Sequence, residues 1–146
     1  MTTTEELKIF GTLIARTSRV IRLSFTQAFR EHDLDITPEQ WVILDKLYQD
    51  NGLSQTELAS DSFKNAPTVS RIIDLLCDKK LTERQRFKND RRRYKIFLTP
   101  TGKTLVEKAL PIVADLRTQG WQGLSEADYT GFQRIMNQIF KNFAEK

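Results

Sequence analysis

The sequence has few of the residues that build metal sites or catalytic centres. Its 146 residues include one cysteine, Cys77, and one histidine, His32. One cysteine cannot form an internal disulfide, and the two residues together supply too few soft ligands for a zinc site. There is no glycine-rich phosphate loop, and the histidine has no flanking nucleophile. We therefore expect a protein that is not an enzyme and that carries no metal or other cofactor.

Long apolar runs are lacking as well. The longest extend over only a few residues, as in 41–44, whereas a helix needs about 20 apolar residues to cross a bilayer. The first six residues lack the basic segment and apolar stretch of a secretory signal. The sequence therefore predicts a cytoplasmic protein without a membrane span.

Basic residues, by contrast, are concentrated in one stretch. The chain has a net charge of +4. Between Lys79 and Lys95, nine basic residues stand against two acidic ones, so this segment carries +7 and the remainder carries −3. Such a concentrated positive patch is typical of a surface that binds a polyanion.

Periodicity and capping signals predict four helices before this stretch. Apolar residues recur at three- and four-residue steps over residues 5–30, without an internal proline, which indicates one long amphipathic helix. Thr37, Ser54 and Asn65 are each suited to cap a following helix. We expect these three helices to end near 51–52, near 61–62 and before the basic stretch.

The last of these four helices has two distinct faces. Val69, Ile72, Ile73 and Leu76 point one way at 100° per residue, while Pro67, Arg71, Asp74 and Asp78 point roughly the opposite way. Two short helices joined by a tight turn, the second with a free polar face, are typical of a helix-turn-helix and its recognition helix.

The basic stretch itself predicts a β-hairpin. Residues 83–87 and 94–98 alternate in character and flank the basic segment 88–93. Burying several adjacent guanidinium groups would be too costly, so the tip must project into water or onto an anion.

The C-terminal part predicts further helix. Thr99 and Pro100 start a helix that runs to about Gly120 or Gly123, and Pro111 inside it predicts a kink or a break into two helices. Ser125 with Asp128 caps a last helix. Its apolar stripe is too rich to be left exposed.

The order and residues of these segments resemble the MarR family of bacterial regulators, over nearly the whole chain. The most specific segments are 53–59, 70–74, 83–84, 90–92 and 98–102. The predicted hairpin corresponds to the wing of this family. In it, Asp90 and Arg92 match an aspartate that is followed two residues later by an arginine, and the Leu-Thr-x-x-Gly pattern after the wing is intact. Two positions depart from the family pattern: Lys80 stands where a glycine is usual, and Thr82 where a small apolar residue often stands.

The resemblance implies a mainly α fold with a small β wing, a winged helix-turn-helix with N- and C-terminal dimerisation helices. We expect one MarR-like domain over 1–146, a DNA-binding lobe at 37–99, and dimerisation helices at 5–31 and 101–145. Two unpartnered amphipathic terminal helices also require a partner on physical grounds. The residues predicted for the dimer interface are Ile9, Leu13, Leu116, Trp121, Phe132, Ile135, Met136, Ile139 and Phe140.

The function implied is a double-stranded DNA-binding transcriptional regulator, more commonly a repressor, that binds a palindromic operator as a homodimer. We predict that Arg71 reads a base in the major groove, that Arg92 enters the minor groove, and that Asp90 orients the wing. The residues predicted to contact DNA are Ser54, Gln55, Asn65, Pro67, Thr68, Ser70, Arg71, Arg84, Arg86, Lys88, Arg91, Arg92, Arg93 and Lys95. For Arg71 the alternative is a surface ion pair with Asp74 or Asp78.

Other interpretations stay open at this point. A winged-helix module can bind protein or RNA, and Cys77 is either a small buried hydrophobe or the sensor of a redox-responsive regulator. Relatives bind small anionic aromatic effectors, which suggests a pocket formed by Arg16, Phe29, His32 and Trp41. The alternative is that Trp41 belongs to the core and that His32 favours a helix C-terminus through the helix dipole.

Overall fold

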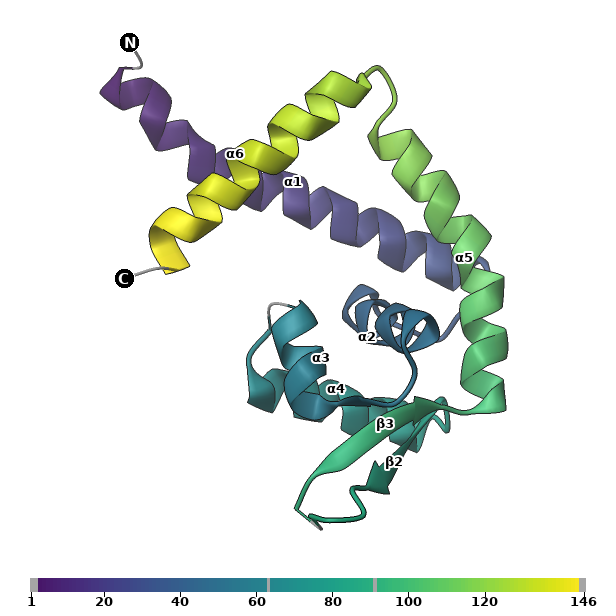
Figure 1. Cartoon of the computed structure of the whole chain (residues 1–146). Coiled ribbons are helices and arrows are strands. Elements are labelled where there is room, and N and C mark those ends of the chain that lie inside the picture. The colour runs from purple at the N-terminus through teal and green to yellow at the C-terminus, as the bar shows by residue number, and fades with distance from the viewer. Residues whose placement is uncertain (1–2, 63, 91, 145–146) are drawn as a thin grey trace. The chain divides into compact units, whose positions relative to one another are not determined.

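A computed structural model describes residues 3–62, 64–90 and 92–144 (Figure 1). The chain forms two compact units, Met1–Val113 and Ala114–Lys146. The elements are α1 (Thr4–Glu31), α2 (Pro38–Gln49), β1 (Leu53–Ser54), α3 (Gln55–Ser62), α4 (Ala66–Asp78), β2 (Thr82–Arg86), β3 (Tyr94–Leu98), α5 (Pro100–Gly120) and α6 (Glu126–Ala144). The predicted fold class, mainly α with a small β wing, is confirmed.

The predicted caps set the helix starts. The Thr37 hydroxyl accepts a hydrogen bond from the Gln40 amide at 3.1 Å, and the Gln40 side chain accepts one from the Thr37 amide at the same distance. Asn65 accepts from the amide of Thr68 at 2.9 Å at the start of α4. These bonds satisfy donors that the first turn of a helix leaves without a partner, which is why the sequence located these helices well.

One core holds the lobe together. The apolar face of α4 is buried in it, as are the inward residues of α2 and the end of α1. The side chains with no exposed surface include Phe29, Ile43, Leu44, Leu47, Leu58, Val69, Ile73, Leu76, Ile96, Val106 and Val113. Because the opposite face of α4 takes no part in this core, the core fixes which side of α4 faces outward.

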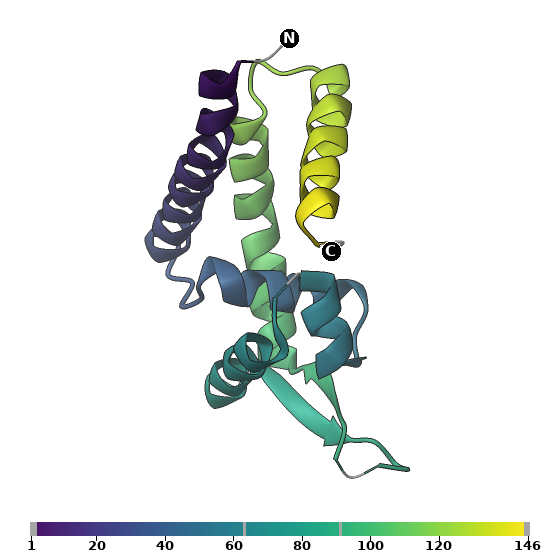
Figure 2. The same ribbon diagram turned by 90° about the vertical axis from the view of Figure 1, so that its left-hand side faces the viewer.

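The sheet has three strands in the order β1-β3-β2, all antiparallel. The predicted hairpin of β2 and β3 is present, and Figure 2 shows that it extends beyond the helices of the lobe. The sequence did not predict β1, a two-residue strand in which Leu53 pairs with Ile96. It follows a turn in which Gly52 has a φ of +84°, as the Asn51-Gly52 pair suggests.

The predicted break at Pro111 is wrong, because α5 is one helix from Pro100 to Gly120. Pro111 is exposed, while Ala109 and Val113 on either side of it are fully buried. Packing therefore holds the helix on its inner face, and water can reach the backbone carbonyl that proline leaves without a donor.

Two properties of the described residues bear on the class of protein. None of their helices is both long enough and apolar enough to span a membrane. Within the same residues, no cluster of three or more histidine, cysteine or acidic side chains has the arrangement of a metal site.

Candidate nucleic-acid interface

The outward face of α4 is polar and accessible. Pro67 and Arg71 are exposed, and Thr68 and Ser70 are partly so. Within the described residues Arg71 makes no ion pair, since Asp74 bonds to a different arginine. Its guanidinium keeps its five donors available in the planar arrangement that suits a guanine edge.

The basic side chains of the hairpin are held over aromatic rings. Arg86 lies over Tyr94, with 5.7 Å from its guanidinium carbon to the ring centroid. Arg93 and Lys95 lie over Phe87, at 4.6 Å and 5.3 Å from its centroid. Cation–π contact of this kind limits the rotamers of long side chains while leaving their charges in water. The stem of the wing therefore presents its charges in a defined arrangement.

The tip of the wing is shaped by Asp90. Its carboxylate accepts a hydrogen bond from the amide of Arg92 at 3.0 Å, and its carbonyl accepts one from the amide of Arg93 at 3.2 Å. Asp90 thus orients the backbone of the turn. The side chains of Lys88 and Arg92 are exposed, and Arg91 lies outside the described residues.

Three residues predicted to contact DNA have hydrogen-bond partners within the lobe. Ser54 is buried, and its hydroxyl accepts from the Glu57 amide and donates to the Glu57 carboxylate, both at 3.1 Å. Arg84 donates to Gln55 at 3.1 Å and to Asp74 at 2.5 Å. The capping pattern of the sequence anticipates the Ser54–Glu57 pair, but the sequence carries no signal for the partners of Arg84, which are 10 and 29 positions away.

The two departures from the family pattern have local explanations. Lys80, which stands where a glycine is usual, has a φ of +60°, in the left-handed region that glycine adopts most readily. Thr82 is buried, with its hydroxyl 3.3 Å from the sulfur of the half-buried Cys77. Gly102 is required by its surroundings, because a Cβ there would lie 2.0 Å from the carbonyl oxygen of Leu81.

The predicted effector residues are not brought together in this chain. Phe29 and Trp41 are core residues whose ring centroids are 6.2 Å apart. His32 caps α1, with a ring nitrogen 2.8 Å from the Ala28 carbonyl oxygen. Arg16 is exposed four turns earlier on the same helix, about 24 Å along the axis at 1.5 Å per residue. The alternative interpretation, with Trp41 in the core and His32 at a helix end, fits the structure.

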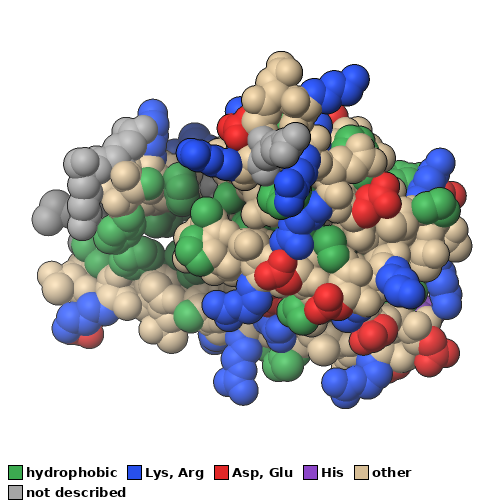
Figure 3. Space-filling view, turned by 90° about the horizontal axis from the view of Figure 1, so that it is seen from below, with side chains coloured by type: hydrophobic (Ala, Val, Ile, Leu, Met, Phe, Trp, Pro, Cys, Tyr) green, Lys and Arg blue, Asp and Glu red, His purple; other side chains and the backbone are tan. Residues whose placement is uncertain are grey.

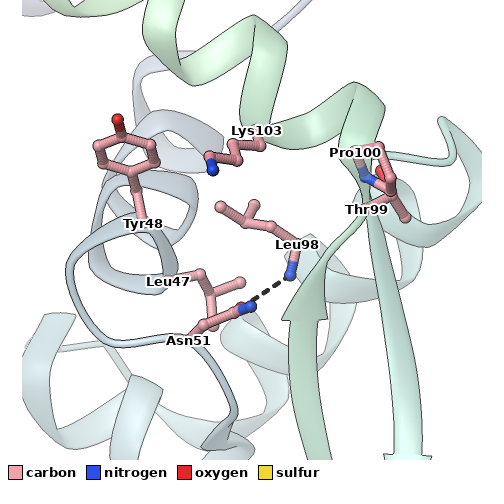
Figure 4. A pocket seen from close by; sticks show the side chains of 7 residues that line it. All are labelled: Leu47, Tyr48, Asn51, Leu98, Thr99, Pro100 and Lys103. Atoms are coloured by element: carbon pink, nitrogen blue, oxygen red, sulfur yellow. Dashed lines mark hydrogen bonds between the residues drawn. The ribbon is translucent and has the colours of Figure 1, made fainter.

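A different cavity lies on the lobe. It has a volume of about 630 Å³ and lies between the end of α2, the end of β3 and the start of α5. Figure 4 shows Tyr48 and Lys103 in the upper part of the view, with Leu98 and Leu47 below them. The side-chain oxygen of Asn51 accepts a hydrogen bond from the amide of Leu98 at 2.9 Å and closes one side.

The face that carries α4 and the wing is mixed in charge. Figure 3 shows Lys and Arg side chains across it, with acidic side chains between them. The hairpin segment contributes the exposed cations Arg86, Lys88, Arg92, Arg93 and Lys95. A surface of this kind attracts phosphates and still leaves room for selective contacts between the charges.

The terminal helices expose large apolar side chains. Helix α1 buries only Phe29, and α6 buries none of its residues. Among the residues predicted for the dimer interface, Ile9, Leu13, Phe132, Ile135 and Phe140 are exposed, and Leu116, Trp121, Met136 and Ile139 are half-buried. Monomeric soluble proteins seldom expose so many large apolar side chains along a helix.

Comparison with known proteins agrees with these features. Residues 36–94 match the model of the MarR family. The structure is similar to S. aureus MepR in a complex with DNA, with 29% identity and a TM-score of 0.83 over 92% of this chain and 98% of that one. It is also similar to Bordetella bronchiseptica BpsR, whose DNA binding is regulated by 6-hydroxynicotinic acid, with 25% identity and a TM-score of 0.78 over 88% of this chain and 96% of that one.

A third similarity supports the fold alone. A variant of MarR from E. coli, in complex with operator DNA, shares 21% identity and a TM-score of 0.82 over 95% of this chain and 99% of that one. The family match covers the recognition helix and most of the wing, and the structural similarity extends to the terminal helices. The chain is therefore similar to the MarR family over residues 36–94 and shares the fold of the solved regulators along most of its length.

Proposed function

We propose that this chain is a sequence-specific, double-stranded DNA-binding transcriptional regulator that represses its target from a palindromic operator as a homodimer. The observation that carries the proposal is the exposed polar face of α4, with Arg71 free of ion pairs in the described part of the chain, beside a hairpin of ordered cations.

The geometry suits the two grooves of B-DNA. The major groove admits one helix, so α4 would place Arg71 against a guanine, with Pro67, Thr68 and Ser70 beside it and Asn65 at the helix start. The hairpin would place Arg92 in the minor groove, where a narrow A·T-rich segment concentrates negative potential. The phosphate contacts would come from Arg86, Lys88, Arg91, Arg93 and Lys95.

The homodimer follows from the terminal helices. The exposed apolar side chains of α1 and α6 are too many for a stable solvated surface, and a second copy of the chain would bury the same patches on both protomers. A two-fold dimer would then present its two recognition helices to half-sites about one turn of DNA apart, which accounts for the palindrome.

Selection from a random duplex library tests the proposal. We expect the wild-type protein to recover a palindromic sequence, with half-sites centred about 10 base pairs apart. With about four phosphates neutralised by each protomer, log K should fall with log[salt] at a slope near −7. A slope near zero, or stronger competition by RNA than by duplex DNA, would overturn the proposal in favour of an RNA- or protein-binding module.

Two substitutions distinguish the proposed base contact of α4 from the proposed minor-groove contact of the hairpin. Arg71→Ala should lower affinity for the selected duplex by about tenfold or more and relax the preference over a scrambled duplex, because a bidentate base contact is lost. Arg92→Ala should weaken binding to both duplexes, because the potential of the minor groove acts on charge. Binding isotherms on the two duplexes make the comparison, and identical effects of the two variants would contradict the assignment.

The proposed regulator also responds to a small anionic aromatic effector. Support comes from BpsR, whose DNA binding is regulated by 6-hydroxynicotinic acid, and from the cavity beside Lys103. Its volume lies within the range of small-molecule pockets, and it combines one cation with the phenol of Tyr48 and apolar side chains. It also adjoins Thr99, which connects the wing to α5.

Calorimetric titration with 6-hydroxynicotinic acid, with neutral benzamide as the reference compound, tests this location. We expect saturable binding of the acid that Lys103→Gln abolishes and that Lys141→Gln, which removes an equal charge on α6, leaves unchanged. Equal binding by the wild type and the Lys103→Gln variant would exclude this cavity.

A further inference from the structure

Arg84 joins three elements of the lobe. From β2, its Nε donates to the side-chain oxygen of Gln55 on α3 at 3.1 Å, and its Nη2 donates to a carboxylate oxygen of Asp74 on α4 at 2.5 Å. Directly across the sheet, Arg84 pairs with Ile96, whose side chain is fully buried. The guanidinium therefore connects the core-anchored base of the wing to the recognition helix.

The position of Asp74 makes this bond unusual. Asp74 lies three residues after Arg71, on the outward face of α4, and its side chain is 60% exposed. A free carboxylate there would repel the phosphates of bound DNA. The bond to Arg84 explains why an aspartate stands on this face. The guanidinium neutralises the charge of Asp74, and Asp74 in turn anchors Arg84 to α4.

We propose that Arg84 is a positioning residue for DNA recognition, which fixes the wing relative to the recognition helix through Asp74 and Gln55. Helix α4 and the wing would enter different grooves, so they must keep a fixed separation and angle. A small displacement of either one would lose both the base contact and the minor-groove contact. A guanidinium with its planar, fixed donors can hold two partners in one geometry, which the ammonium of a lysine cannot do. The proposal rests on the proposed DNA-binding function.

The competing role for Arg84 is the one that its place in the basic stretch suggests, a direct phosphate contact. The two roles predict opposite effects for Asp74→Ala. If Arg84 contacts a phosphate, Asp74→Ala frees it and removes a repulsive charge, so DNA binding becomes tighter. If Arg84 positions the wing, Asp74→Ala removes its anchor, so specific binding weakens even though a negative charge has gone from the DNA-facing side.

The experiment measures the affinity ratio between the duplex recovered by selection and a scrambled duplex of the same length and composition. We expect Asp74→Ala to reduce this ratio by about tenfold. The matched control is Asp78→Ala, one turn further along the same face of α4, where Asp78 has no ion pair within the described residues. This control should leave the ratio unchanged and raise the affinity for both duplexes slightly.

Three further measurements keep the test decisive. The slope of log K against log[salt] should be the same for Arg84→Ala and wild type, whereas a lost phosphate contact would make it shallower by about 1. The ratio of the Arg84→Ala/Asp74→Ala double variant should match that of Arg84→Ala alone, because one link is broken in both. Arg84→Lys should keep the charge and still lose specificity.

Each possible result either supports the positioning role of Arg84 or contradicts it. Tighter binding by Asp74→Ala, additive losses in the double variant, or full specificity in Arg84→Lys would overturn the positioning role. If circular dichroism shows that Asp74→Ala is unfolded, Gln55→Ala decides instead, since it breaks the weaker link and should reduce the ratio two- to threefold; an unchanged ratio there overturns the proposal. A wild-type protein that selects no sequence would refute the proposed function itself.

Discussion

Helix α4 of the lobe and the C-terminal helix α6 each carry a stripe of apolar side chains, but only α4 buries its stripe. In α4, Val69, Ile73 and Leu76 have no exposed surface. In α6, Phe132 and Phe140 are 51% and 57% exposed, and no residue of the helix is buried. Both helices are strongly amphipathic, so the sequence pattern does not distinguish them. The difference shows that an apolar stripe specifies burial without specifying whether the covering surface lies in the same chain.

A charge in the stripe of α6 tests that difference most strongly. Phe132→Glu should convert the proposed dimer to monomers and lower the affinity for the selected duplex by at least about 100-fold, because linked half-sites lose their effective concentration. Light scattering after gel filtration and binding isotherms measure the two effects.

The control for this variant is Asn137→Glu, which adds the same charge to an exposed position away from the stripe. It should remain dimeric and bind normally. A Phe132→Glu protein that stays dimeric would show that α6 covers no part of the interface.

A truncation in the core of the lobe should behave differently. Ile73→Ala should lower the free energy of unfolding by about 2–5 kcal/mol, because it removes a fully buried side chain and leaves a cavity. Chemical denaturation at several protein concentrations measures this loss for the lobe. We expect the same loss at every concentration, whereas Ile139→Ala in α6 should show a loss that depends on concentration.

The sequence located the lobe well because its signals are local. Caps such as Thr37 and Asn65 act on amides three residues away, and the periodicity of α4 fixes its buried face. The break into two helices that Pro111 suggests is absent, because packing on the inner face of α5 outweighs the local signal. The sequence left two interpretations open for Trp41, and the packing of Phe29 against Trp41 favours the core over the effector pocket.

The candidate site could be predicted only in part. The exposed residues of α4 and the wing follow from helical phase and from the concentration of charge. The partners of Arg84 do not, because Gln55 and Asp74 become its neighbours only when three elements assemble. The strand β1 is hidden for the same reason, since two residues carry no period and gain their structure from pairing with β3.

A substitution in the turn after α4 should have a smaller effect on the stability of the lobe. Lys80→Gly should raise the free energy of unfolding by about 0.5–1 kcal/mol, because a φ of +60° is unfavourable for a residue with a Cβ. Thermal and chemical unfolding measure it. A destabilised variant would mean that the lysine side chain contributes more than the strain of its backbone.

The smallest effect is expected where α1 meets α2. Arg22 donates to Glu39 at 2.5 Å and 3.1 Å, and this hydrogen bond holds the pKa of the Glu39 carboxyl below its usual value. A lowered pKa in the folded state means that the stabilisation is present above the unfolded pKa and is lost as the pH falls through the folded value.

Glu39→Gln should therefore cost less than about 1 kcal/mol at pH 7, since the pair is partly exposed, and the difference from wild type should shrink as the pH is lowered toward 3. Urea unfolding at a series of pH values measures it. A difference that is constant with pH would show that the pair contributes through packing and not through charge.

The links between distant segments also determine how the lobe opens. The Leu98 amide donates to a side chain 47 positions earlier, and Lys79 donates to the carbonyl of Asp35, 44 positions earlier. Breaking these bonds requires the lobe to come apart as one cooperative unit, whereas the amides of Phe87, Arg92 and Arg93 donate to residues within the tip of the wing. Hydrogen exchange should thus be slow at the base of the wing and fast at its tip. In the proposed complex, the tip of the wing would then adjust to the width of the groove while its base stays fixed to the lobe.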